Sequence, residues 1–196
     1  RGQALPLTRI SRAPVVGVGG GIRSTAGYDP ETRCWIAPGA GCSPVPDAPT
    51  AEDAAAALAA VWEPFEDFPF VGDPDRDNLL GLLILPLVRE IVGHQPTPLH
   101  LLEKPSPGTG ATLLAEAVSV IVSGDLPLGM AEGRGDEEEW RKRLTAALLE
   151  SPEVVLVDNL SRTLDSACLA RALTSASWND RILGRSQTCQ IPIRCA

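Results

Sequence analysis

Glycines and a hydroxyl residue are spaced for phosphate and metal binding in the segment Glu103–Thr112. A phosphate loop needs glycine where the backbone must adopt positive φ and approach oxygen closely, which Gly108 and Gly110 allow. It also needs a following helix that points free N–H groups at the anion. A hydroxyl at the start of that helix, here Thr112, can bind Mg²⁺. We therefore interpret Pro107–Thr112 as a nucleotide-binding loop.

A carboxylate suited to the same metal lies further along the chain. Val154–Val157 is a run of four apolar residues, three of them β-branched, and Asp158 follows it. This pattern predicts a buried parallel strand with an acid at its C-terminal tip. In a phosphate-loop site such an aspartate binds the water shell of magnesium. We expect Thr112 and Asp158 to share one hydrated Mg²⁺, about 4–7 Å apart. The alternative is a Gly/Pro turn and an unrelated Asp.

The loop departs from the usual phosphate-loop pattern at two positions. Ala111 stands where a lysine normally precedes the hydroxyl residue, and Pro105 replaces the first glycine. Lys104 lies at a different position, where we expect a solvent-exposed side chain. The loss of lysine removes a charge-assisted contact to the β- and γ-phosphates, worth on the order of 1.5–3 kcal/mol. The backbone N–H groups remain, so weak nucleotide binding is still expected.

The elements around these residues follow from periodicity and from start and stop signals. A helical lead-in (50–95) starts at the Thr50–Asp53 capping box, and Pro86 is expected to kink or split its second helix. Strands then alternate with helices, which predicts a parallel α/β sheet. The expected helices are 51–62, 75–92, 111–122, 136–150 and 164–173, and the expected strands are 98–102, 126–130 and 154–157, with a β-prone run at 190–194.

Composition bounds the class of protein. Residues 1–49 are rich in Pro and Gly and predict a linker, or the tail of an upstream domain, with one short hairpin near Tyr28–Ile36.

Of the 196 residues, the longest apolar run is Leu79–Val88, too short to span a membrane, so we expect a cytoplasmic protein. The net charge of −8 argues against broad electrostatic binding of nucleic acid by this chain. The five cysteines are interpreted as free thiols, and a metal site that uses Cys34, Cys42 and one of the two histidines is the alternative.

Four segments together resemble a known family. They are Glu103–Leu114, Asp136–Arg143, Val154–Leu164 and Ser177–Arg194. They resemble ATPases of the primase–helicase class, with AAA+ or superfamily-3-like cores, encoded by phages, plasmids and integrated elements. The resemblance implies an incomplete three-layer P-loop core over residues 96–196. It further implies ATP and Mg²⁺ as ligands, a homo-oligomeric ring, and DNA bound through the full-length protein.

The resemblance also assigns roles to individual residues. Gly108, Thr109, Gly110 and Thr112 would hold the phosphates and the metal, and Asp158 would be the acid of the metal-binding strand. Asn159 stands where many AAA+ proteins have the glutamate that polarises water; an amide orients water but does not accept its proton. A sensor strand, an arginine finger and a lid would lie beyond Ala196.

Three functional interpretations therefore remain open. The first is the ATPase core of a replicative, helicase-like protein, with weak or no hydrolysis in this chain. The second is a nucleotide-binding scaffold or switch that does not hydrolyse ATP. The third is a truncated, inactive remnant, which Ala111 favours.

Overall fold

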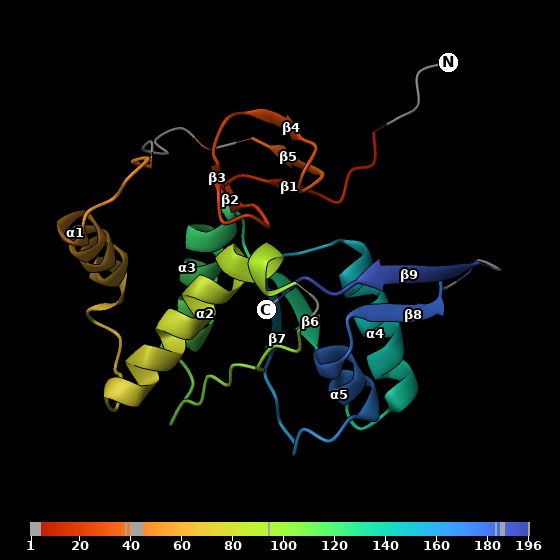
Figure 1. The fold of residues 1–196 in the computed structure, drawn as a ribbon. Helices are drawn as coiled ribbons and strands as arrows, with labels where there is room; N and C mark the ends of the chain where they lie inside the picture. The colour runs from red at the N-terminus through yellow and green to blue at the C-terminus, as the bar shows by residue number, and fades with distance from the viewer. Residues whose placement is uncertain are drawn as a thin grey trace.

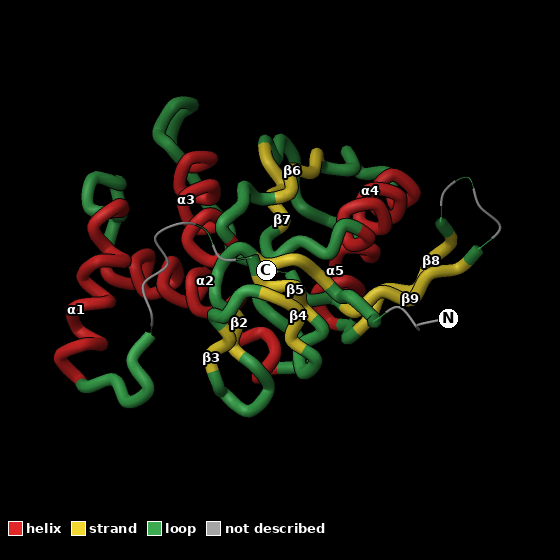
Figure 2. Tube along the Cα trace, turned by 90° about the horizontal axis from the view of Figure 1, so that it is seen from above, coloured by secondary structure: helices red, strands yellow, loops and turns green. Residues whose placement is uncertain are grey.

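The fold mixes α-helices with several small β-sheets (Figure 1). The structure is a computed structural model that describes residues 5–37, 39, 45–93, 95–182, 184 and 187–195. No helix within these ranges is long and apolar enough to cross a membrane. A central strand pair is formed by β6 (Leu128–Ala131) and β7 (Val155–Asp158). On one side of it lie the helices from α1 (Ala51–Trp62) to α3 (Ala111–Ser123), and on the other lie α4 (Glu137–Leu149) and α5 (Ala167–Thr174), in both Figure 1 and Figure 2.

The N-terminal segment contains five short strands. They are β1 (Arg9–Ser11), β2 (Val15–Val16), β3 (Ile22–Arg23), β4 (Gly27–Asp29) and β5 (Cys34–Ile36). The predicted hairpin is present, because β4 pairs antiparallel with β5 and Tyr28 lies opposite Trp35. The segment also has structure beyond the hairpin, since β1 pairs with β5, and Val15, Cys34 and Ile36 form a small core. Strands of two or three residues are too short to leave a periodic sequence signal.

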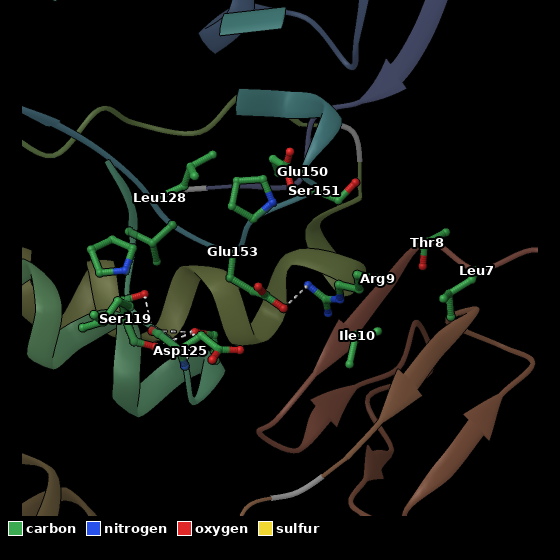
Figure 3. Close-up of a pocket in the computed structure, with 15 residues that line it drawn as sticks. Leu7, Thr8, Arg9, Ile10, Ser119, Asp125, Leu128, Glu150, Ser151 and Glu153 are labelled. Carbon is green, nitrogen blue, oxygen red and sulfur yellow. Dashed lines mark hydrogen bonds and ion pairs between the residues drawn. The ribbon is translucent and has the colours of Figure 1, made fainter. Parts of the chain in front are cut away.

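These strands are attached to the rest of the molecule by charged side chains. Arg9 forms a nearly buried ion pair with Glu153 at 3.5 Å. Arg12 forms an exposed ion pair with Asp125 at 3.2 Å, and its N–H donates to Ser123 O. Figure 3 shows the Arg9–Glu153 pair at a cavity of about 450 Å³ between β1 and the segment after α4.

Two helices form the lead-in, as expected. Helix α1 (Ala51–Trp62) begins with the predicted capping box, in which the Thr50 hydroxyl accepts the Asp53 N–H at 3.1 Å. A short 3₁₀ turn, η1 (Glu63–Phe65), leads towards α2 (Asp73–Val92). Pro86 is buried inside α2 and does not split it.

The central elements are a parallel strand pair and the helix that precedes it. Helix α3 (Ala111–Ser123) begins at the end of the candidate phosphate loop. Strand β6 (Leu128–Ala131) pairs parallel with β7 (Val155–Asp158), and Ala131 lies opposite Asp158. Both strands were predicted within one or two residues of these bounds. The crossover between them runs through α4 (Glu137–Leu149). Asp136 caps this helix, and its carboxylate accepts the Glu138 N–H.

The prediction of a strand at Pro98–Leu102 is wrong. This run has neither helix nor strand structure, and the Leu99 and Leu101 side chains are exposed. A strand requires a hydrogen-bonded neighbour. Within the described residues β7 pairs with β6 alone, and Pro98 has no N–H to donate. The described strands therefore form four small sheets and not the expected three-layer parallel core.

The C-terminal part forms a separate hydrophobic core. Helix α5 (Ala167–Thr174) precedes an antiparallel hairpin of β8 (Ser177–Arg181) and β9 (Thr188–Pro192). Trp178 is completely buried between this hairpin and α4. A third core, around Phe65 and Val118, joins η1, α2 and α3. The β-prone run predicted at 190–194 overlaps β9.

Candidate functional site

The loop before α3 has the backbone shape that the sequence indicated. Gly108 and Gly110 have φ angles of 85° and 88°, in the left-handed region that favours glycine. The Thr109 hydroxyl donates to Ser106 O at 3.1 Å and closes the turn. Pro107 and Gly108 are exposed, whereas Thr109 and Gly110 are half-buried. The tip of the loop is therefore exposed to solvent, and its last residues are partly covered where α3 begins.

Helix α3 starts without a side-chain cap. Gly110 occupies the cap position, its carbonyl accepts the Leu114 N–H at 2.8 Å, and no side chain accepts from the first turn. The first backbone N–H groups of a helix have no partner inside the helix. They are therefore available to an anion, which the positive end of the helix dipole also favours.

Phe68 packs against the end of the loop. A Cβ atom added at Gly110 would lie 3.3 Å from the Phe68 ring. Phe68 belongs to an aromatic cluster with Phe65 and Phe70, with ring centroids 6.0 and 6.5 Å apart. The lead-in before α2 thus restricts the space beside Gly110.

Thr112 and Asp158 are brought together, as expected from the sequence. The Thr112 hydroxyl donates to Asp158 Oδ2 at 3.4 Å across 46 residues of chain. The other carboxylate oxygen, Oδ1, accepts the N–H of Asn159 at 2.7 Å. Both side chains lie at the C-terminal end of β7, beside the first turn of α3. The separation is slightly shorter than the predicted 4–7 Å.

The two oxygens suit magnesium in kind and in spacing. Mg²⁺ prefers oxygen ligands at about 2.0–2.1 Å in octahedral geometry, so neighbouring ligands lie about 3 Å apart. It commonly binds one or two protein groups and takes its remaining ligands from phosphates and water. No cluster of three or more His, Cys, Asp or Glu residues occurs in the part of the chain that the structure describes. Thr112 and Asp158 would hold Mg²⁺ only together with a phosphate ligand.

Two positions at which ATP hydrolysis would need a charged side chain do not have one. Ala111 is half-buried at the first residue of α3 and offers only a methyl group, while Lys104 is exposed before the loop. Asn159 is exposed, with a φ angle of 57°. Its backbone N–H is committed to Asp158, which fixes the carboxylate orientation.

Glu132 is a second carboxylate at this sheet edge and was missed from the sequence. It directly follows Ala131, the residue opposite Asp158. The Ser161 hydroxyl donates to Glu132 Oε1 at 2.6 Å, and this bond is the main reason that the pKa of Glu132 is lowered. Arg162 and Arg134 add to the effect. An acid two residues after the predicted strand 126–130 was the signal that could have identified it.

The cysteines lie apart from this site. Cys34 is buried in the N-terminal strands, and Cys168, Cys189 and Cys195 border the C-terminal core; all four have free thiols. Burial raises the pKa of the Cys34 thiol despite the nearby Arg9 guanidinium. The suggested metal site at Cys34 and Cys42 involves Cys42, which lies outside the described residues.

Comparison of the chain with protein families, with curated proteins and with solved structures finds no match.

Proposed function

We propose that the chain binds Mg²⁺–ATP through Pro107–Thr112 and Asp158. The observation that supports this most is the 3.4 Å approach of the Thr112 hydroxyl to the Asp158 carboxylate, at the start of a helix preceded by two left-handed glycines. A helix N-terminus with free N–H groups favours phosphate, and paired oxygens favour a hard cation. A Gly/Pro turn with no ligand does not require the hydroxyl and the carboxylate to converge.

The proposed activity is binding with little or no hydrolysis. Ala111 cannot supply the charge that a lysine would place on the β- and γ-phosphates. Asn159 cannot accept a proton from water. Phosphoryl transfer depends on such positioned charges, and an arginine finger alone is worth about 10³–10⁵ in rate. The bound metal would neutralise phosphate charge, and the first turn of α3 would orient the phosphates.

The wider role follows the family resemblance and remains a proposal. In that role the chain is the nucleotide-binding part of a ring-forming ATPase that acts on DNA in mobile-element replication. The second candidate is a nucleotide-dependent scaffold or switch, favoured by Ala111 and Asn159 together. The two candidates differ in whether ATP is turned over.

Titration of a fluorescent ATP analogue with Mg²⁺ present tests the binding proposal. We expect weak binding by the wild-type chain, at least about tenfold tighter binding by Ala111→Lys, and loss of binding by Asp158→Ala. Ala56→Lys, on the exposed surface of α1, is the control for added charge. Equal affinity of the wild type, Ala111→Lys and Asp158→Ala would exclude a nucleotide site, and rapid wild-type turnover would contradict the account of hydrolysis.

A further inference from the structure

Strand β6 has an unpaired edge on the side away from β7. Leu128 N–H donates to Val154 O at 3.0 Å, which directs the backbone groups of Leu128 towards β7. Backbone groups of successive strand residues point to alternate sides, so those of Gly129 and Ala131 point away from β7. No described strand pairs with that side of β6. Both residues are exposed.

A groove runs along this edge and is bounded by α4. It has a volume of about 360 Å³ and is lined by Gly129 and Ala131 from β6 and by Arg143, Ala146 and Glu150 from the α4 region. Residues 143, 146 and 150 are spaced by three and four, so they lie along one stripe of the helix surface. Arg143 and Glu150 lie at opposite ends of the stripe, with the small, exposed Ala146 between them. The groove therefore has charged side chains at its two ends and a small side chain at its centre.

We propose that this edge pairs with the same edge of a second copy of the chain, with the two β6 strands antiparallel about a two-fold axis. If Met130 lies at the axis, Gly129 of each copy faces Ala131 of the other. Such a pair exchanges both N–H···O bonds, and symmetry repeats it. The result is one continuous sheet of four strands.

The α4 stripes are self-complementary in this arrangement. A two-fold axis perpendicular to the sheet places both α4 helices on the same face, side by side and antiparallel. Arg143 contacts Glu139 at 3.5 Å and donates to Glu132 O at 3.2 Å within its own chain. In the dimer it also lies beside Glu150 of the other copy, and the Ala146 residues permit helix packing at about 8–10 Å. Charge complementarity and strand-edge pairing therefore both favour a second copy of the chain as the partner. An unrelated extended peptide would satisfy the strand edge but has no reason to match both charges.

The contact area is small, because one short strand edge and one helix stripe contribute. We therefore expect a weak dimer, with a Kd on the order of 0.1 mM. The proposed dimer is independent of nucleotide and differs in stoichiometry from the ring that the family resemblance implies. Its failure would leave the nucleotide proposal untouched.

Sedimentation equilibrium of the full chain, up to about 1 mM protein, tests the dimer. Gly129→Pro removes the outward N–H without breaking a β6–β7 bond, since proline is tolerated at such edge positions. We expect this variant to be monomeric, while Gly129→Ala, which keeps the N–H, still dimerises. Amide exchange of Gly129 and Ala131 should slow as wild-type protein concentration rises.

Charge variants test the α4 contact without touching the strand. Glu150→Arg places an arginine beside Arg143 of the other copy. This contact between like charges should weaken association at least about tenfold. The double variant Arg143→Glu, Glu150→Arg should restore it. A chain that stays monomeric up to about 1 mM, forms only larger rings, or dimerises equally well as Gly129→Pro would overturn the proposal.

Discussion

Arg9 and Glu153 form a nearly buried ion pair at 3.5 Å that joins the N-terminal strands to the segment before β7 (Figure 3). The pair is incompletely satisfied, because Arg9 Nε and Glu153 Oε1 are buried without a hydrogen bond. Burial raises the pKa of Glu153, and the Arg9 charge opposes that shift. Desolvation thus outweighs the Coulomb attraction at this contact.

Stability should fall with rising pH through the Glu153 titration. A raised pKa means that the folded chain binds more protons than the unfolded chain above the ordinary value of 4.5. The stabilising contribution is therefore complete below that value and is lost as pH rises through the raised pKa. Glu153→Gln should remove this dependence of stability on pH, because the amide does not titrate. The free energy of unfolding, measured with urea between about pH 4.5 and 7.5, tests this, with Glu66→Gln as the exposed control. Parallel pH profiles for Glu153→Gln and wild type would contradict the prediction.

Thr145→Val should destabilise the C-terminal core by about 1–3 kcal/mol. The buried Trp178 N–H donates to the Thr145 hydroxyl oxygen at 2.8 Å, and that oxygen lies 2.8 Å from Asp180 Oδ2. Valine keeps the shape but leaves the indole N–H without an acceptor. Thr174→Val is the matched control, because its hydroxyl donates to Ala170 O at the exposed end of α5. Chemical denaturation measures the free energy of unfolding of both variants. Equal losses would show that the hydrogen bond from Trp178 does not account for the effect of Thr145→Val.

Gly110→Ala should cost about 1–3 kcal/mol of stability and weaken nucleotide binding. The φ angle of 88° is strained for any L-residue, and the new Cβ would lie 3.3 Å from Phe68. Gly108→Ala separates these causes, since its φ is 85° but its added Cβ meets nothing within 4 Å. Thermal unfolding should rank Gly110→Ala below Gly108→Ala. Replacing Phe68 by Leu in the Gly110→Ala background should reduce the difference in thermal stability between the two glycine variants. An unchanged difference would rule out the Phe68 contact as its cause.

Local signals were sufficient to predict the helices and β7, but non-local pairing was not predictable. The Thr50 cap, the glycines before α3 and the β-branched run ending at Asp158 act within a few residues, and the structure places them as expected. Pro98–Leu102 has strand-like composition, yet a strand exists only with a partner. Glu132 escaped notice because its position matters only once β6 lies beside β7.

Thr112 offers the sharpest test of the proposed metal site. Its hydroxyl contacts Asp158 at 3.4 Å, a long hydrogen bond that contributes little to folding, so Thr112→Val should change stability by less than about 1 kcal/mol. Thr112→Val keeps the side-chain volume but removes the oxygen that would bind Mg²⁺, whereas Thr112→Ser keeps the oxygen. With a fluorescent ATP analogue, Mg²⁺ should tighten binding by the wild type and by Thr112→Ser at least about tenfold, and by Thr112→Val hardly at all. Without Mg²⁺ the three proteins should bind equally weakly, through the backbone N–H groups of α3. An equal response of Thr112→Val and Thr112→Ser to Mg²⁺ would show that the hydroxyl is no metal ligand, even if nucleotide binds.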